Sequence, residues 1–138
     1  MSRLRLVFVG ALVALVLPLT AGTASAQSGE ITITGAEVVT DFGKPSGSDV
    51  NVIGTGTCTA PGVVIIRVRI KDQVTGGVAA GTGFTQCVSA GEHIQWLVTA
   101  ANPPVPTVRP GDKADVQASA TGGINAADEK VVIVQQFH

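Results

Sequence analysis

Short runs in which apolar and polar residues alternate make up most of the chain after Gln27. The clearest run is 63–71, where Val64, Ile66, Val68 and Ile70 alternate with Ile65, Arg67, Arg69 and Lys71. A period of two is typical of a β-strand with one buried face and one solvent-facing side. Gly, Pro, Asn and Asp interrupt these runs about every ten residues, and no window after Gln27 has a helical period. The pattern therefore predicts an all-β domain.

Seven strands are expected from this pattern, at 31–40, 50–57, 63–71, 78–85, 93–100, 113–120 and 131–137. Thr75-Gly76-Gly77 predicts a tight hairpin, since glycine accepts the positive φ of such turns. The proline-rich stretch 102–106 cannot join a ladder and predicts a crossover between sheets. Trp96 falls on the apolar face of its strand and is expected to fill the core. Together these features favour a seven-stranded immunoglobulin-like β-sandwich.

The first 26 residues have a different character. Arg3 and Arg5 are followed by an apolar run from Leu6 to Leu19 and by the small residues Ala24-Ser25-Ala26. This order is that of a cleaved signal peptide, and the apolar run is shorter than the roughly 20 residues that span a bilayer. We therefore expect residues 1–26 to be a signal peptide, residues 27–138 to be a single domain, and the protein to be secreted and extracellular.

Cys58 and Cys87 are the two cysteines of the chain. In an exported domain such a pair predicts one disulfide, because no Cys-x-x-Cys spacing points to redox chemistry. Both cysteines precede Trp96, unlike the order in antibody domains, so the bridge is expected near one end of the sandwich rather than as a buried pin between the sheets.

Charge and composition exclude several functions. Two of the nine basic residues lie in the expected signal peptide, so seven basic residues against ten acidic ones give the remainder a net charge of −3. Without a basic cluster, nucleic-acid binding is not expected, and neither is membrane binding once the signal peptide is removed. The two histidines do not stand at ligand spacing from a cysteine, so we expect no metal site and no cofactor.

The candidate ligand-facing residues are Arg67, Arg69 and Lys71, which follow one another along one face of a strand. Alternate residues of a strand stand about 7 Å apart, a spacing at which these cations could hold an anionic polymer. The alternative is a solvated face that keeps a sticky β-segment from aggregating.

An enzyme is not expected, and no catalytic residue is assigned. A hydrolase would need a nucleophile and an acid around His93, the one histidine inside the domain, and no Gly-x-Ser-x-Gly elbow is present. Gly54, Gly56, Gly81 and Gly83 allow either close packing of the sheets or the floor of a cleft. The cleft is the alternative function, a carrier of a small apolar ligand lined by Phe42, Phe84 or Trp96.

The mature part resembles the small exported immunoglobulin-like domains of unknown function from actinobacteria. The resemblance rests on the strand 52–58, the strand 64–73, the Cys87 to Trp96 spacing, and Arg109-Pro110-Gly111 before an Ala/Val-rich strand. It implies a fold and no activity. The sequence therefore favours a secreted, non-enzymatic binding or structural module, a monomer whose partner is an unknown envelope component or extracellular protein.

Overall fold

The structure is a computed structural model that describes residues 29–40 and 48–137. The expected signal peptide and Phe42 lie outside these residues. The strands are β2 (Glu30–Thr40), β3 (Ser48–Thr57), β4 (Gly62–Asp72), β5 (Val78–Cys87), β6 (His93–Asn102), β7 (Lys113–Gly122), β8 (Ala126–Ile133) and β9 (Gln135–Phe137). No helix capable of crossing a membrane is found among the described residues.

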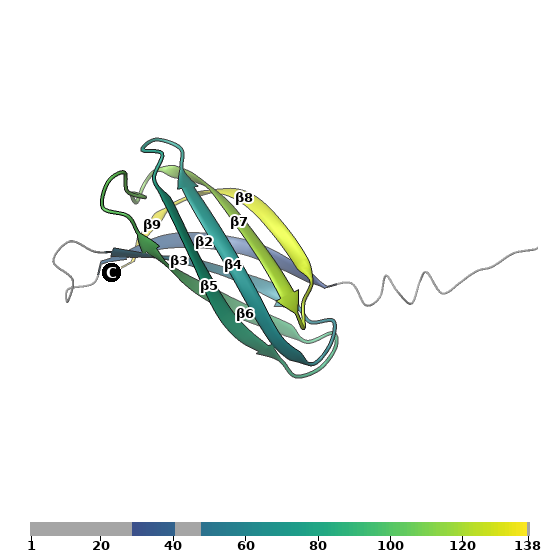
Figure 1. The fold of residues 1–138 in the computed structure, drawn as a ribbon. Helices are drawn as coiled ribbons and strands as arrows, with labels where there is room; N and C mark the ends of the chain where they lie inside the picture. Colours follow the sequence, from purple (N-terminus) through teal and green to yellow (C-terminus); the bar gives the residue numbers. More distant parts are fainter. Residues whose placement is uncertain (1–28, 41–47, 138) are drawn as a thin grey trace, which may run out of the picture.

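The strands form two four-stranded sheets, one in the order β6-β3-β2-β9 and the other in the order β5-β4-β7-β8. In Figure 1 the second sheet crosses in front of the first. The expected all-β sandwich is confirmed, and so is the crossover, because the chain leaves one sheet with β6 and enters the other with β7.

The expected count of seven strands is wrong, because the described chain has eight. The last expected strand, 131–137, is divided at Val134, and its first part begins earlier, at Ala126. Val134 is buried, and its amide donates to the carbonyl of Asp112. At this point the chain changes sheets, since β8 pairs with β7 and β9 runs parallel to β2. The sequence does not show such a change of sheet, because no glycine or proline interrupts the stretch 131–137.

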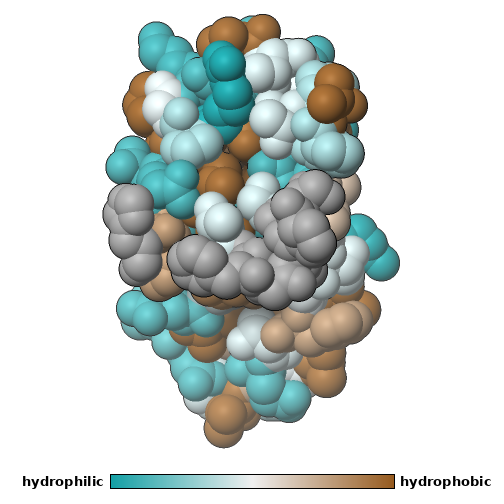
Figure 2. All heavy atoms as spheres, turned by 90° about the vertical axis from the view of Figure 1, so that its left-hand side faces the viewer, coloured by the Kyte–Doolittle hydropathy of each residue, from teal (hydrophilic) through white to brown (hydrophobic). Residues whose placement is uncertain are grey.

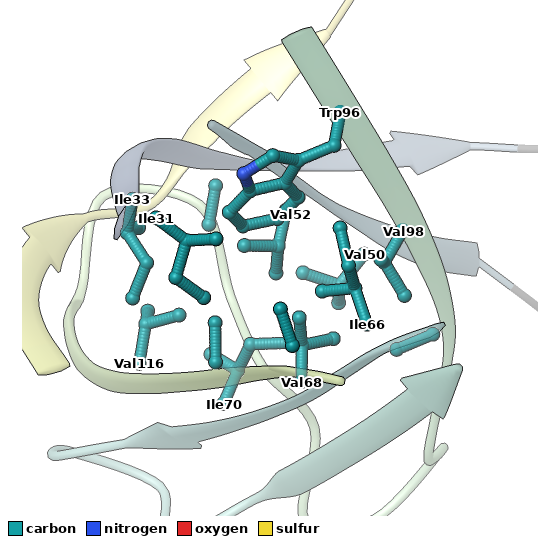
Figure 3. Close-up of a cluster of buried hydrophobic side chains, with 14 of the residues drawn as sticks. Ile31, Ile33, Val50, Val52, Ile66, Val68, Ile70, Trp96, Val98 and Val116 are labelled. Carbon is teal, nitrogen blue, oxygen red and sulfur yellow. The ribbon is translucent and has the colours of Figure 1, made fainter. Parts of the chain in front are cut away.

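The core lies between the two sheets and is made of the inward residues of each alternating strand (Figure 3). Ile33, Val50 and Val52 of one sheet face Ile66, Ile70 and Val116 of the other. Trp96 is 4% exposed, and its indole N–H donates to the carbonyl of Thr55 at 2.8 Å. The prediction that Trp96 fills the core is confirmed.

Glycines allow the strands to approach closely at this core. A Cβ atom on Gly81 would lie 2.5 Å from the carbonyl oxygen of Thr99 in β6, and one on Gly54 would lie 2.3 Å from the Trp96 ring. Neither distance is possible for real atoms, so β5 sits directly on β6 and the indole lies across β3. These glycines serve close packing, one of the two uses that the sequence allows.

Gly54→Ala is expected to lower the free energy of unfolding by about 2–3 kcal/mol, because the added methyl group overpacks a well-filled core. The methyl group would also lie 2.3 Å from the carbonyl oxygen of Thr32, so backbone has to move as well as the ring. Urea unfolding measures the loss. Thr55→Ala, at the exposed neighbouring position, is the control and should change stability little.

The disulfide joins Cys58, directly after β3, to Cys87, the last residue of β5. Its place at one end of the sandwich is as expected, but the expectation that it is not a buried link between sheets is wrong. Both residues are at most 2% exposed, and they connect strands of different sheets. Burial comes from the loops around them, because Cys58 exchanges backbone hydrogen bonds with Gly91 and Glu92.

Candidate functional site

The outer face of the β5-β4-β7-β8 sheet carries the three cations predicted as ligand-facing. Arg67, Arg69 and Lys71 are exposed, while Val68 and Ile70 between them point into the core. The structure thus brings the three together in one row on β4, a strand in the interior of the sheet. Across the β4–β7 ladder the row faces Ser119, Gln117 and Asp115, in that order.

None of these three cations has a hydrogen bond or ion pair within the described residues. The nearby carboxylates bind elsewhere: Glu129 accepts from Gln117 Nε2 at 2.9 Å, and Asp115 accepts from Gln73 Nε2 at 3.0 Å. Asp115 does so although it stands directly opposite Lys71. The two carboxylates are therefore hydrogen-bonded by glutamine side chains, and the three cations remain available to a ligand.

A shallow hollow of about 510 Å³ lies beside the arginines, between β4, β7 and β8. It exists because the row that continues Arg67 across the sheet consists of small residues, Ser119 on β7 and Ala127 on β8. Gln117 and Glu129 form part of its lining. An anionic group that enters this hollow would meet the guanidinium groups of Arg67 and Arg69 on one side.

Charge is divided between the two outer faces of the described sandwich. The outward positions of the β5-β4-β7-β8 sheet hold four cations, the three of the row and Lys113, against two carboxylates, Asp115 and Glu129. The outward positions of the other sheet hold Glu30, Glu37 and Asp49 and no lysine or arginine within the described strands. An anionic ligand is thus attracted to one face and repelled from the other, although the domain as a whole is acidic.

No protein family matches this sequence, and no curated protein matches it either. Twelve chains of solved structures match the fold. One is a beta-glucuronidase from glycoside hydrolase family 2, with 14% identity, a TM-score of 0.46 and coverage of 77% of this chain and 12% of that one. Another is DesR, a beta-glucosidase from Streptomyces venezuelae, with 11% identity, a TM-score of 0.36 and coverage of 74% and 15%. This chain therefore spans a small part of either glycosidase.

His93 lies exposed at the start of β6, where its Nδ1 atom is 3.2 Å from the hydroxyl oxygen of Thr57. The neighbouring carboxylate of Glu92 accepts hydrogen bonds from the amides of Val88 and Ser89 and so closes its own turn. Glu92 therefore supports the turn before β6, and Thr57 is the side-chain partner of His93 within the described residues.

Phe84 and Trp96, the two described aromatic residues that were named for a ligand cleft, do not come together. Phe84 is 72% exposed on the outer face of its sheet, whereas Trp96 is buried between the sheets. At the end of the molecule shown in Figure 2, apolar surface is broken into separate patches among hydrophilic ones. A carrier would need these rings to face one space.

Sequence reasoning missed the two buried polar side chains that fix the loops at the opposite end from the disulfide. Asp72 ends β4, and its carboxylate accepts from the amides of Val74, Thr75 and Arg109 at 2.7–3.0 Å. Asn102 ends β6, and its side chain bonds to both the amide and the carbonyl of Val108. Together they hold the hairpin and the crossover in place.

A signal for Asp72 was present in the alternation itself, since position 72 continues the inward series that ends at Ile70. Burial acts to raise the pKa of the Asp72 carboxyl. The hydrogen bonds from the amides of Arg109, Thr75 and Val74 outweigh that effect and hold the pKa below its ordinary value. The carboxylate is therefore the native form.

Proposed function

We propose that this protein is a secreted, non-enzymatic module that binds an anionic polymer outside the cell or in the cell envelope, through the outer face of the β5-β4-β7-β8 sheet. The observation that carries the proposal is the row of Arg67, Arg69 and Lys71, which has no ion pair within residues 29–40 and 48–137, while the neighbouring carboxylates are bound by glutamines.

The immunoglobulin-like class is part of the proposal, and the strand order supports it. The first, second and fifth strands (β2, β3, β6) share one sheet, and the third, sixth and seventh (β4, β7, β8) share the other. The fourth strand, β5, pairs with β4 rather than joining the first sheet. Export is supported by the disulfide, since such bonds persist in oxidising compartments.

The geometry suits a ligand with repeated negative charges. Alternate residues along β4 place successive cationic groups roughly 7 Å apart, a distance within reach of neighbouring phosphates or carboxylates in a polymer. Arginine binds either group through two parallel N–H donors. The open hollow lets a chain lie across the sheet instead of entering a closed pocket.

Arg67→Gln combined with Arg69→Gln is expected to weaken binding about tenfold, the loss expected from removing roughly 1.4 kcal/mol of charge-assisted contacts. The probes are long-chain inorganic polyphosphate and alginate, which present phosphate and carboxylate respectively. Isothermal titration calorimetry at two salt concentrations measures the affinity, and the wild-type affinity should fall as salt rises.

The matched control is Gln95→Glu combined with Leu97→Glu, which makes the same change in net charge at alternate exposed positions of β6 in the other sheet. This control should bind as the wild type does. Equal losses in both variants would mean that net charge alone matters, and wild-type protein that binds neither polymer would refute the proposal.

A further inference from the structure

The two lateral sides of the sandwich differ in how their edge strands are protected. On the side of β2 and β8, side chains cover the backbone of β2. Asp128 accepts from the amide of Ile33 at 2.8 Å, and Lys130 donates to the carbonyl of the same residue. Gln136 donates to the carbonyl of Val38. Charged and amide groups placed in this way keep an edge from pairing with another chain.

The edge strand β5, on the opposite side, has no such protection. Its ten residues contain neither a charged residue nor a proline, and it pairs with β4 in unbroken register, without a bulge. No hydrogen bond from another part of the described chain reaches its free edge. A long, regular, uncharged edge is a template for a further strand.

The outward side chains of β5 also leave an apolar surface uncovered. Phe84 is 72% exposed, and Val78 at the other end of the strand is 37% exposed. Between them stand the small residues Ala80 and Thr82. A large aromatic ring exposed on an edge strand costs free energy unless another surface covers it.

We propose that β5 pairs antiparallel with β5 of a second copy of this chain, about a two-fold axis at Thr82. This register places Phe84 opposite Ala80 of the second copy, so that the ring covers a small side chain, and it places Val78 opposite Gln86. Because the strand is uncharged, self-pairing brings no like charges together. Each contact occurs twice, as a two-fold interface requires.

The pairing joins two four-stranded sheets into one of eight strands, with both outer faces on the same side. The two rows of Arg67 and Arg69 then share a continuous surface, about 14 Å apart across three strand spacings. Given the proposed function, one polymer could engage both rows and bind more tightly than to either alone. This dimer would replace the monomer expected from the sequence.

Thr82 gives a sharp test, because it faces itself across the axis. Sedimentation velocity over a concentration series should show a dimer for the wild-type domain and monomers for Thr82→Lys and Thr82→Asp separately. A one-to-one mixture of the two variants should recover the dimer, since opposite charges then meet. Thr121→Lys, an exposed position on the same face of interior strand β7, should remain dimeric.

A wild-type domain that stays monomeric at every concentration would overturn the inference. So would a dimer that persists in both Thr82 variants, or folded variants whose mixture stays monomeric; circular dichroism establishes folding. The polymer-binding variant Arg67→Gln/Arg69→Gln should dimerise normally, so failure of the dimer and failure of polymer binding are seen separately.

Discussion

Replacing Asp72 with alanine is expected to lower the free energy of unfolding by about 3–4 kcal/mol, because it leaves three backbone amides in a buried site without an acceptor. Those amides belong to the β4–β5 turn and to the crossover before β7, so the loss should loosen two connections at once. Thermal unfolding should shift by about 15 °C or more for a domain of this size.

Asp115→Ala is the matched control, since that carboxylate is exposed and Gln73 is its one hydrogen-bond partner in the part of the chain that the structure describes. It should cost no more than about 0.5 kcal/mol. Acid titration gives an independent check. In the unfolded chain the Asp72 carboxylate binds a proton near the ordinary pKa of 3.8, whereas in the native protein it binds one only at a lower pH. Its contribution is therefore complete above that pH and is lost as pH falls through the lower native pKa.

Asp72→Asn should lose less stability than the wild type does over this acid range, because its side chain does not titrate. If the wild type and Asp72→Asn showed the same dependence of thermal midpoint on pH, the Asp72 carboxylate would not be a source of the acid sensitivity. The Asp72 side chain would then contribute to stability in a way that does not depend on its charge.

Removal of the disulfide by Cys58→Ala together with Cys87→Ala should cost about 3–4 kcal/mol. The bridge closes a loop with a sequence separation of 29 residues, and its loss frees that loop in the unfolded chain. The two cysteines are also buried between loops, so the smaller side chains leave a gap. Urea unfolding of the oxidised wild type and the double variant measures the difference.

Wild-type protein treated with a reductant should lose a similar amount of stability, since the same constraint is removed without a substitution. An unchanged urea midpoint in both cases would show that the loops at this end hold together without the sulfur bridge.

The alternation of apolar and polar residues was enough to predict most of the fold, because a strand that buries one face has apolar residues at every second position. The faces of β4 and the core position of Trp96 follow from this rule. The crossover after β6 follows instead from the prolines of the stretch 102–106, which cannot join a ladder. The change of sheet at Val134 follows from neither, because the sequence there is an unbroken apolar run, 131–134, with no turn residue to mark the break. The parallel pairing of β9 with β2 joins residues about 100 positions apart and has no local signal.

The candidate site shows the same limit. Local sequence places Arg67, Arg69 and Lys71 on one face, since their spacing alone decides it. Whether those cations are paired depends on partners from β7 and β8, which only the fold brings near. The engagement of Glu129 by Gln117 is such a case, because it depends on the β7–β8 register. The edge contacts of Asp128 and Lys130 likewise connect residues of different sheets.

The most direct test of the proposed anion-binding face is a nuclear magnetic resonance titration of residues 27–138 with inorganic polyphosphate. Shift changes in backbone amides should gather at Arg67, Arg69 and Ser119, and the amides of Gln95 and Leu97 on the opposite face should stay in place. Changes centred on β6 and β3, or none at saturating polyphosphate, would contradict binding through the β5-β4-β7-β8 sheet.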